Sequence, residues 1–215
     1  MTHKEQVHYS TELTRRCFLK SICLCTAGIA MSDVLWPCCG MADVILPKDF
    51  AVEIQRRGLA FNVKVFREFE VGRVIPNPHF EYSLALRHRR LPFEARYATR
   101  YLSSALGIID EALLGAYVSS SIMNMARKET SGPVMSELKA FDSNAVRTEF
   151  GADWGVTSVI TPEPTFSKYD SGSVNVIYLK KKRALGYSIY LFPAEPSDEI
   201  VQIIDEIFHA MQFTK

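Results

Sequence analysis

Two stretches of the chain alternate between apolar and polar side chains. Residues 80–86 alternate strictly, and residues 93–102 repeat the pattern with Phe93, Ala95, Tyr97 and Tyr101 on one side. Successive side chains of a β-strand point to opposite faces of a sheet, so this alternation predicts two strands that each bury one face. The basic connection between them, residues 87–92, is short enough to form a hairpin.

Further strand patterns occur on both sides of this pair. Residues 51–55 and 59–66 are predicted strands, separated by Arg56-Arg57-Gly58, which is typical of a turn. Three runs rich in β-branched and aromatic residues predict further strands, the last two joined by four basic residues: 156–160, 174–179 and 185–192. Together these strands predict one sheet connected mainly by hairpins.

Apolar residues recur at helical spacing from residue 103 onward. Between residues 103 and 122 they repeat every three to four positions, which predicts a helix whose first turn Ser103 or Ser104 could cap. A shorter helix is predicted to begin at Asp142 or Ser143. It should end at Gly151, because glycine readily adopts the left-handed backbone that terminates helices.

The last predicted helix follows Ser197, with an apolar stripe on one side and Asp198 and Glu199 in its first turn. These carboxylates complement the positive end of the helix dipole. Because hairpins dominate and no flexible linker divides residues 43–215, we predict a single α+β domain with a mostly antiparallel sheet packed against helices. The order of the elements loosely resembles the Mog1/PsbP-like sandwiches, but no motif carries over a functional residue.

The N-terminal segment contains a distinctive heptad. Its residues are Thr14, Arg15, Arg16, Cys17, Phe18, Leu19 and Lys20. The heptad resembles the twin-arginine export signal of bacteria, Ser/Thr-Arg-Arg-x-Phe-Leu-Lys, and it precedes an apolar stretch as that class requires. The resemblance implies recognition by the twin-arginine translocase through Arg15, Arg16, Phe18 and Leu19, and it implies a periplasmic location for the exported protein.

The uncharged stretch at residues 21–32 is too short for a membrane-spanning helix, which needs roughly 20 apolar residues, and fits a signal-peptide core. Signal peptidases require small side chains at the −3 and −1 positions, and Gly40 and Ala42 supply them. We therefore predict a signal peptide at residues 1–42 and cleavage between Ala42 and Asp43. Cleavage after Ala30 satisfies the same rule but would leave two cysteines on an exposed terminus.

Composition limits what the exported domain can do. The 215-residue chain has a formal net charge of +1, and removal of residues 1–42 leaves 21 basic and 21 acidic residues. A neutral domain has no overall field that would concentrate nucleic acid, so we expect no nucleic-acid partner. All five cysteines precede residue 40. Their loss excludes thiolate zinc sites, iron–sulfur clusters, cysteine nucleophiles and c-type haem, and we expect no cofactor.

Two basic clusters fall between predicted strands. The first contains Arg87, Arg89 and Arg90, and the second contains Lys180, Lys181, Lys182 and Arg183. If both turns lie at the same end of the sheet, they would form one electropositive patch for an anionic ligand, lipid headgroups or an acidic envelope protein. The alternative interpretation is that both are solvated turns whose charges discourage aggregation.

Other chemical candidates are weaker. Neither a metal-binding spacing of histidines nor a nucleophilic serine motif is present, and His209 lies one helical turn after Asp205, which suggests an ordinary pair. Asp153 and Trp154 could face a pocket, although a turn cap and a core aromatic fit the same positions. We expect a non-enzymatic ligand- or protein-binding domain of the cell envelope. The alternative is an envelope enzyme or an accessory subunit of a co-exported redox complex.

Overall fold

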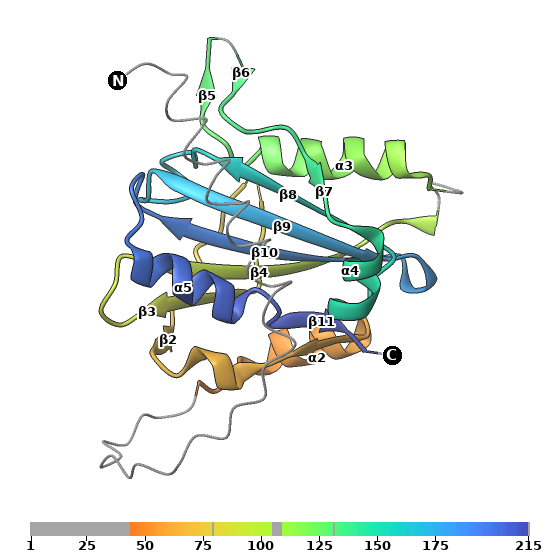
Figure 1. Ribbon diagram of the computed structural model, residues 1–215, viewed down its shortest axis with the longest axis horizontal. Coiled ribbons are helices and arrows are strands. Elements are labelled where there is room, and N and C mark those ends of the chain that lie inside the picture. Colours follow the sequence, from red (N-terminus) through yellow and green to blue (C-terminus); the bar gives the residue numbers. More distant parts are fainter. Residues whose placement is uncertain (1–43, 79, 105–108, 131, 215) are drawn as a thin grey trace.

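A seven-stranded antiparallel sheet forms the centre of the computed structural model, which describes residues 44–78, 80–104, 109–130 and 132–214 (Figure 1). The strand order is β2-β3-β4-β10-β9-β8-β7. The bounds are Phe69–Val71 for β2, Leu84–His88 for β3, Glu94–Tyr101 for β4, Lys139–Ala140 for β7, Trp154–Ile160 for β8, Ser171–Leu179 for β9 and Ala184–Phe192 for β10. This sheet confirms the predicted α+β class.

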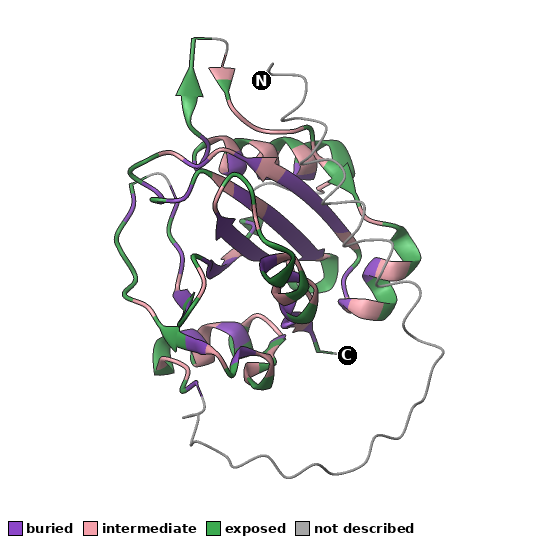
Figure 2. Ribbon diagram, turned by 60° about the vertical axis from the view of Figure 1, so that its left-hand side comes forward, coloured by how far each residue is buried: buried purple, intermediate pink, exposed green. Residues whose placement is uncertain are grey.

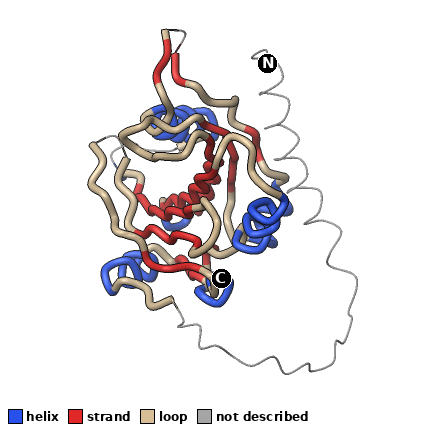
Figure 3. Tube along the Cα trace, turned by 90° about the vertical axis from the view of Figure 1, so that its left-hand side faces the viewer, coloured by secondary structure: helices blue, strands red, loops and turns tan. Residues whose placement is uncertain are grey.

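Helices lie on both sides of the strands (Figure 3). The helix α3 (Glu111–Met123) covers one face, whereas α2 (Lys48–Arg56), α4 (Ser143–Glu149) and α5 (Asp198–Ile207) pack on the other. A small sheet of β1 (Leu59–Phe61) and β11 (Met211–Phe213) packs on this second face. The remaining short elements are η2 (Val63–Phe66), η4 (Lys180–Lys182), β5 (Lys128–Glu129) and β6 (Gly132–Pro133).

The strands at the centre of the sheet are mostly buried (Figure 2), and β10 divides the interior into two hydrophobic cores. All nine of its residues are buried. Tyr190 packs in the core beneath α2 and α5, while Tyr187, Ile189 and Leu191 pack in the core beneath α3. A strand buried on both faces reads as a nearly continuous apolar run, which is why its extent was predictable from sequence.

The region before residue 70 corrects the sequence interpretation. Residues 51–55, predicted as a strand, lie within α2, because Phe50 and Ile54 are one turn apart and both are buried. The predicted strand at residues 59–66 is instead β1 followed by the short helix η2. Asn62 causes the change, because its side chain accepts a hydrogen bond from the Lys64 amide and caps η2.

Several other boundaries also shift. The strand predicted at residues 80–86 begins at Leu84, as β3, and not at Phe80. The long helix is capped by Asp110, whose carboxylate accepts a hydrogen bond from the Leu113 amide at 2.8 Å, and not by Ser103 or Ser104. An acidic cap is the better choice because it satisfies a free amide and also interacts favourably with the helix dipole.

The C-terminal half follows its predicted order. Asp142 caps α4, Gly151 follows that helix with a φ of 60°, and Ser197 caps α5. The strand β11 was not predicted, since a three-residue element carries almost no periodic signal. Among the described residues, no helix combines the length and apolarity needed to cross a membrane.

Candidate functional site

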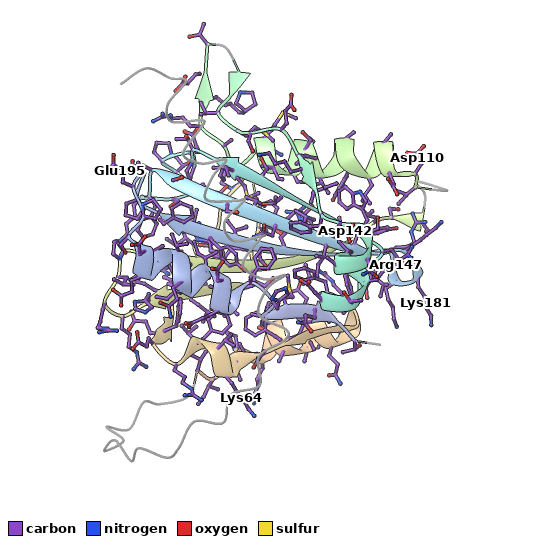
Figure 4. The ribbon with its side chains drawn as sticks, in the orientation of Figure 1. Lys64, Asp110, Asp142, Arg147, Lys181 and Glu195 are labelled. Atoms are coloured by element: carbon purple, nitrogen blue, oxygen red, sulfur yellow. The ribbon has the colours of Figure 1, made fainter. Side chains whose placement is uncertain are left out.

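The two basic clusters lie at opposite ends of the sheet. Strands β4 and β10 run antiparallel, with Ala184 opposite Tyr101 and Leu191 opposite Glu94. The first cluster precedes Glu94 and the second precedes Ala184, so the eight-residue length of β4 separates them, about 25 Å. Figure 4 shows Lys181 at one end of the sheet and Glu195, which follows β10, at the other. The condition for a single electropositive patch is therefore not met.

The first cluster, here called the arginine turn (residues 87–90), has carboxylates beside two of its three arginines. The Arg90 guanidinium lies 2.8 Å from Glu68 and 3.7 Å from Glu199, and Arg87 lies 3.9 Å from Glu94. The hydrogen bond from Arg90 lowers the pKa of Glu68, which keeps this carboxylate ionised. Two of the three arginines of this cluster thus have a carboxylate beside them, whereas Arg89 is exposed and has no ion pair within the described residues.

His88 holds the arginine turn from its buried side. Its Nδ1 accepts hydrogen bonds from the backbone amides of Arg90 (3.3 Å) and Leu91 (3.0 Å), so the proton of the neutral ring belongs on Nε2. Nε2 lies 3.1 Å from the Glu68 carboxylate and donates to it. Since the ring is 3% exposed and both nitrogens are used, this histidine is a structural residue of the turn.

The second cluster, here called the lysine turn (residues 180–183), is different. Lys180, Lys181 and Lys182 are exposed and form η4. Within the described part of the chain, no carboxylate lies at ion-pair distance from any of the three ammonium groups. The Asp153 carboxylate accepts a hydrogen bond from the Lys180 backbone amide at 2.8 Å, which positions the turn.

Arg183 belongs to the scaffold of the lysine turn and not to its free surface. It ends η4 with a left-handed φ of 50°, and its guanidinium donates to the backbone carbonyls of Leu102 and Ser103. A non-glycine residue in this conformation needs such compensating contacts. Three of the four predicted residues of this cluster are thus available to a partner.

An open cavity of about 380 Å³ lies between α2 and the end of β4. It is lined by Asp49, Val52, Glu53, Arg56, Arg57 and Tyr101. The cavity is close to the lysine turn. Gly58, in the turn that follows α2, lies beside Lys182, since a Cβ added at Gly58 would be 3.4 Å from Lys182 Cε. Basic and aromatic residues distant in sequence therefore meet at the same end of the sheet.

Most polar groups of this cavity are already bonded to one another. Arg57 lies 2.8 Å from Glu53 and also donates to the Thr99 hydroxyl, which in turn donates to Glu53 at 2.7 Å. The Arg57 guanidinium stacks 4.9 Å from the Tyr101 ring centroid. These contacts join α2 to the end of β4. They also show why sequence reasoning missed the cavity: its residues became neighbours only once 51–55 formed a helix.

The remaining sequence candidates have structural roles. His209 pairs with Glu149 at 2.7 Å and not with Asp205 as expected, because its ring stacks on Phe150, 4.9 Å away, at the end of α4. Trp154 packs against the core beneath α3, in agreement with the core interpretation. In the residues that the structure describes, no group of three or more His, Cys, Asp or Glu side chains could hold a metal ion.

The residues assigned to export lie outside the described part of the chain. They are Arg15, Arg16, Phe18 and Leu19 of the signal, and Ala42 and Asp43 at the cleavage site. Export and processing therefore remain predictions from the sequence. Comparison with protein-family models, with curated proteins and with solved structures finds no match for this chain.

Proposed function

We propose that the protein is exported to the periplasm by the twin-arginine route, cleaved after Ala42, and acts there as a non-enzymatic binding domain of the cell envelope. Its partner surface is the lysine turn, and the partner is the anionic headgroup layer of an envelope membrane. The export part of the proposal rests on the heptad at residues 14–20 and the apolar stretch that follows it.

The observation that carries the binding part is the lack of internal partners at the lysine turn. A 3₁₀ turn has three residues per turn, so its three consecutive side chains point in three directions. Lysine ammonium groups on flexible stems are hydrated point charges, unlike the rigid fork of an arginine. Such a spread of charge suits a diffuse anionic surface better than a single carboxylate.

The expected strength is modest. Each lysine near an anionic leaflet contributes about 1 kcal/mol, so three contribute about 3 kcal/mol, or roughly a hundredfold in affinity. Tyr101 and Val52, which line the adjacent cavity, are 51% and 45% exposed and add apolar surface beside the charges. Tyrosine is favoured at membrane interfaces because it is apolar along its ring and polar at its tip. The result is reversible, salt-sensitive attachment.

Vesicle binding tests this proposal with a matched pair of variants. Protein purified from the periplasm of expressing cells is sedimented with vesicles of pure phosphatidylcholine or of phosphatidylcholine with phosphatidylglycerol. We expect binding only to the anionic vesicles, weakened by salt, lost in Lys181→Glu and retained in Arg89→Glu. Equal loss in both variants, or equal binding to both vesicles, contradicts the proposal. Retention on a polyglutamate resin without vesicle binding would indicate that the partner is an acidic protein and not a membrane.

Export is tested separately. Cell fractions are blotted for the wild type and for the double variant Arg15→Lys/Arg16→Lys. The wild type should accumulate in the periplasm in a shorter form whose intact mass begins at Asp43, and the double variant should stay in the cytoplasm at full length. Equal export of the two proteins would reject the twin-arginine route.

A second function, accessory subunit of an envelope complex, is favoured by one observation. Val71, Val74 and Ile75 are 43%, 39% and 56% exposed, and they lie on or just after β2, the edge strand of the sheet. Exposed apolar residues beside an open strand edge are features of protein contact surfaces. In native electrophoresis, Ile75→Asp should release the protein from a larger complex, while Leu113→Asp, at a distant exposed position, should not.

A further inference from the structure

One stripe of α2 forms most of the wall of the cavity beside the lysine turn. The lining residues Asp49, Val52, Glu53 and Arg56 are three to four positions apart along the helix or adjacent, so they share one face of it. Tyr101 of β4 completes the wall, and its hydroxyl donates to the Arg56 backbone carbonyl at 2.9 Å. The volume of about 380 Å³ is within the range of small-molecule sites.

The charged side chains of this cavity divide into a bonded pair and two unpaired groups. Glu53 and Arg57 pair with each other at 2.8 Å, so their charges offset one another. Asp49 and Arg56 are exposed, and neither side chain takes part in an ion pair within the described residues. The cavity therefore presents one carboxylate and one guanidinium to a ligand.

These two unpaired charges lie at opposite ends of the stripe. Asp49 is in the first turn of α2 and Arg56 is its last residue, so about 10 Å of helix separates their backbones. A ligand that engages both must carry a cation and an anion several bonds apart. An α-amino acid does not meet this requirement, because its ammonium and its carboxylate share one carbon atom. An ammonium and a phosphate joined through two carbon atoms, as in phosphoethanolamine, do meet it.

The position of the cavity favours a phosphate at the Arg56 end. Gly58, two residues after Arg56, lies beside Lys182 of the lysine turn. The two cations therefore belong to the same end of the sheet, and together they attract an anion. Between the charged ends, Val52 and Tyr101 are 45% and 51% exposed and provide apolar surface for the carbon atoms of a ligand.

We propose that this cavity binds a phosphoethanolamine group. The phosphate oxygens accept hydrogen bonds from the Arg56 guanidinium, the ammonium donates to the Asp49 carboxylate, and Val52 and Tyr101 pack against the two-carbon link. Phosphocholine fits less well, because its quaternary nitrogen has no hydrogen to donate to Asp49. The choice of an ethanolamine lipid as the source rests on the membrane attachment proposed above, whereas free phosphoethanolamine would meet the same groups.

Isothermal titration calorimetry of the periplasmic protein tests the cavity with the free headgroup. Phosphoethanolamine should bind more tightly than phosphocholine, glycerol 3-phosphate or inorganic phosphate. Arg56→Gln should weaken its binding roughly tenfold to a hundredfold, since a charge-assisted hydrogen bond is lost. Asp49→Asn should abolish the preference for phosphoethanolamine over glycerol 3-phosphate, because only the ammonium contacts Asp49. Lys48→Gln, on the same helix but outside the cavity lining, is the matched control and should bind as the wild type does.

The three variants should all keep the Tm of the wild type. Asp49, Arg56 and Lys48 are exposed and have no ion pair within the described residues, so their replacement should not disturb the fold. A loss of binding in Arg56→Gln at unchanged Tm therefore reports on the cavity itself.

Vesicle sedimentation distinguishes the lipid from the free headgroup. At a fixed content of phosphatidylglycerol, replacing phosphatidylcholine by phosphatidylethanolamine should increase binding of the wild type but not of Asp49→Asn. If free phosphoethanolamine binds and the lipid gives no such increase, the lipid source is rejected and the ligand is the soluble compound. Lys181→Glu should lose vesicle binding and keep its affinity for free phosphoethanolamine, so failure of the lysine turn leaves this test intact.

Two results overturn the proposal. The first is phosphoethanolamine binding that is no tighter than that of glycerol 3-phosphate, and the second is equal affinity in Arg56→Gln and Lys48→Gln. In either case, salt-sensitive binding of the wild type to anionic vesicles would still support the lysine turn as the membrane contact.

Discussion

The arginine turn and the lysine turn have nearly the same number of basic residues, yet they differ in almost every physical respect. In the arginine turn, Glu68 and Glu94 pair with the guanidinium groups of Arg90 and Arg87, and a buried histidine holds the backbone. In the lysine turn, the backbone is held by Asp153 and Arg183, and the ammonium groups remain free of carboxylates within the described residues. A run of basic residues therefore keeps its charge unpaired only where the fold supplies no acids to it.

The largest loss of stability is expected when His88, the buried residue that holds the arginine turn, is replaced. His88→Ala deletes a buried ring and three hydrogen bonds, so we expect the free energy of unfolding to fall by about 3 kcal/mol. Urea unfolding measures this loss. If His88→Ala costs no more than an exposed lysine variant, the structural role assigned to this histidine is wrong.

Arg183 supplies the corresponding test in the lysine turn. Arg183→Ala removes two contacts to backbone carbonyls and leaves a left-handed residue without compensation, so we expect a loss of about 1–2 kcal/mol. Arg183→Gly should cost less, because glycine adopts this φ without strain. Equal costs for the two variants, again by urea unfolding, would show that the backbone conformation contributes nothing.

Acid should weaken the arginine turn selectively. The pKa of Glu68 is lowered in the folded protein, so its contribution to stability is present above the unfolded pKa and is lost as pH falls through the lowered folded value. Glu68→Gln should flatten the decline in urea midpoint below about pH 4, whereas Lys181→Gln should leave it unchanged. Parallel curves for Glu68→Gln and the wild type would contradict the assigned pairing.

The smallest effect on stability is expected at the lysines themselves. Lys180→Ala, Lys181→Ala and Lys182→Ala should each change the free energy of unfolding by less than about 0.5 kcal/mol, because all three side chains are exposed and unpaired within the described chain. Each should nevertheless weaken binding to anionic vesicles by roughly fivefold. A variant that loses stability and vesicle binding together would assign the lysines to the fold.

Sequence patterns predicted those elements whose apolar pattern is complete within the element itself. Strand β10 is buried on both faces and α5 has a clear apolar stripe after its Ser197 cap, so both follow from local pattern. The helix α2 was misread because residues 51–55 alternate like a strand, and the decisive pair, Phe50 and Ile54, extends beyond that window.

The candidate sites depend on register, which local pattern does not contain. Whether two hairpin turns share an end of the sheet is decided by which strand pairs with which, and β4 pairs with β10 across a separation of about 90 residues. The same pairing places Tyr101, which lines the cavity, opposite Ala184, which follows the lysine turn. The basic residues were visible in the sequence, but the acids beside one cluster and the cavity beside the other were not.

The pairing of β1 with β11 also constrains the timing of folding. Leu59 lies opposite Phe213, and the Met211 side chain packs over Gly186 of the central strand. During synthesis, β1 emerges early and must wait for its partner until residues 211–213 have been made. The core beneath α2 and α5 therefore closes after translation of this region, not during it. A transport system that accepts only folded cargo would thus receive the protein after β11 has been added.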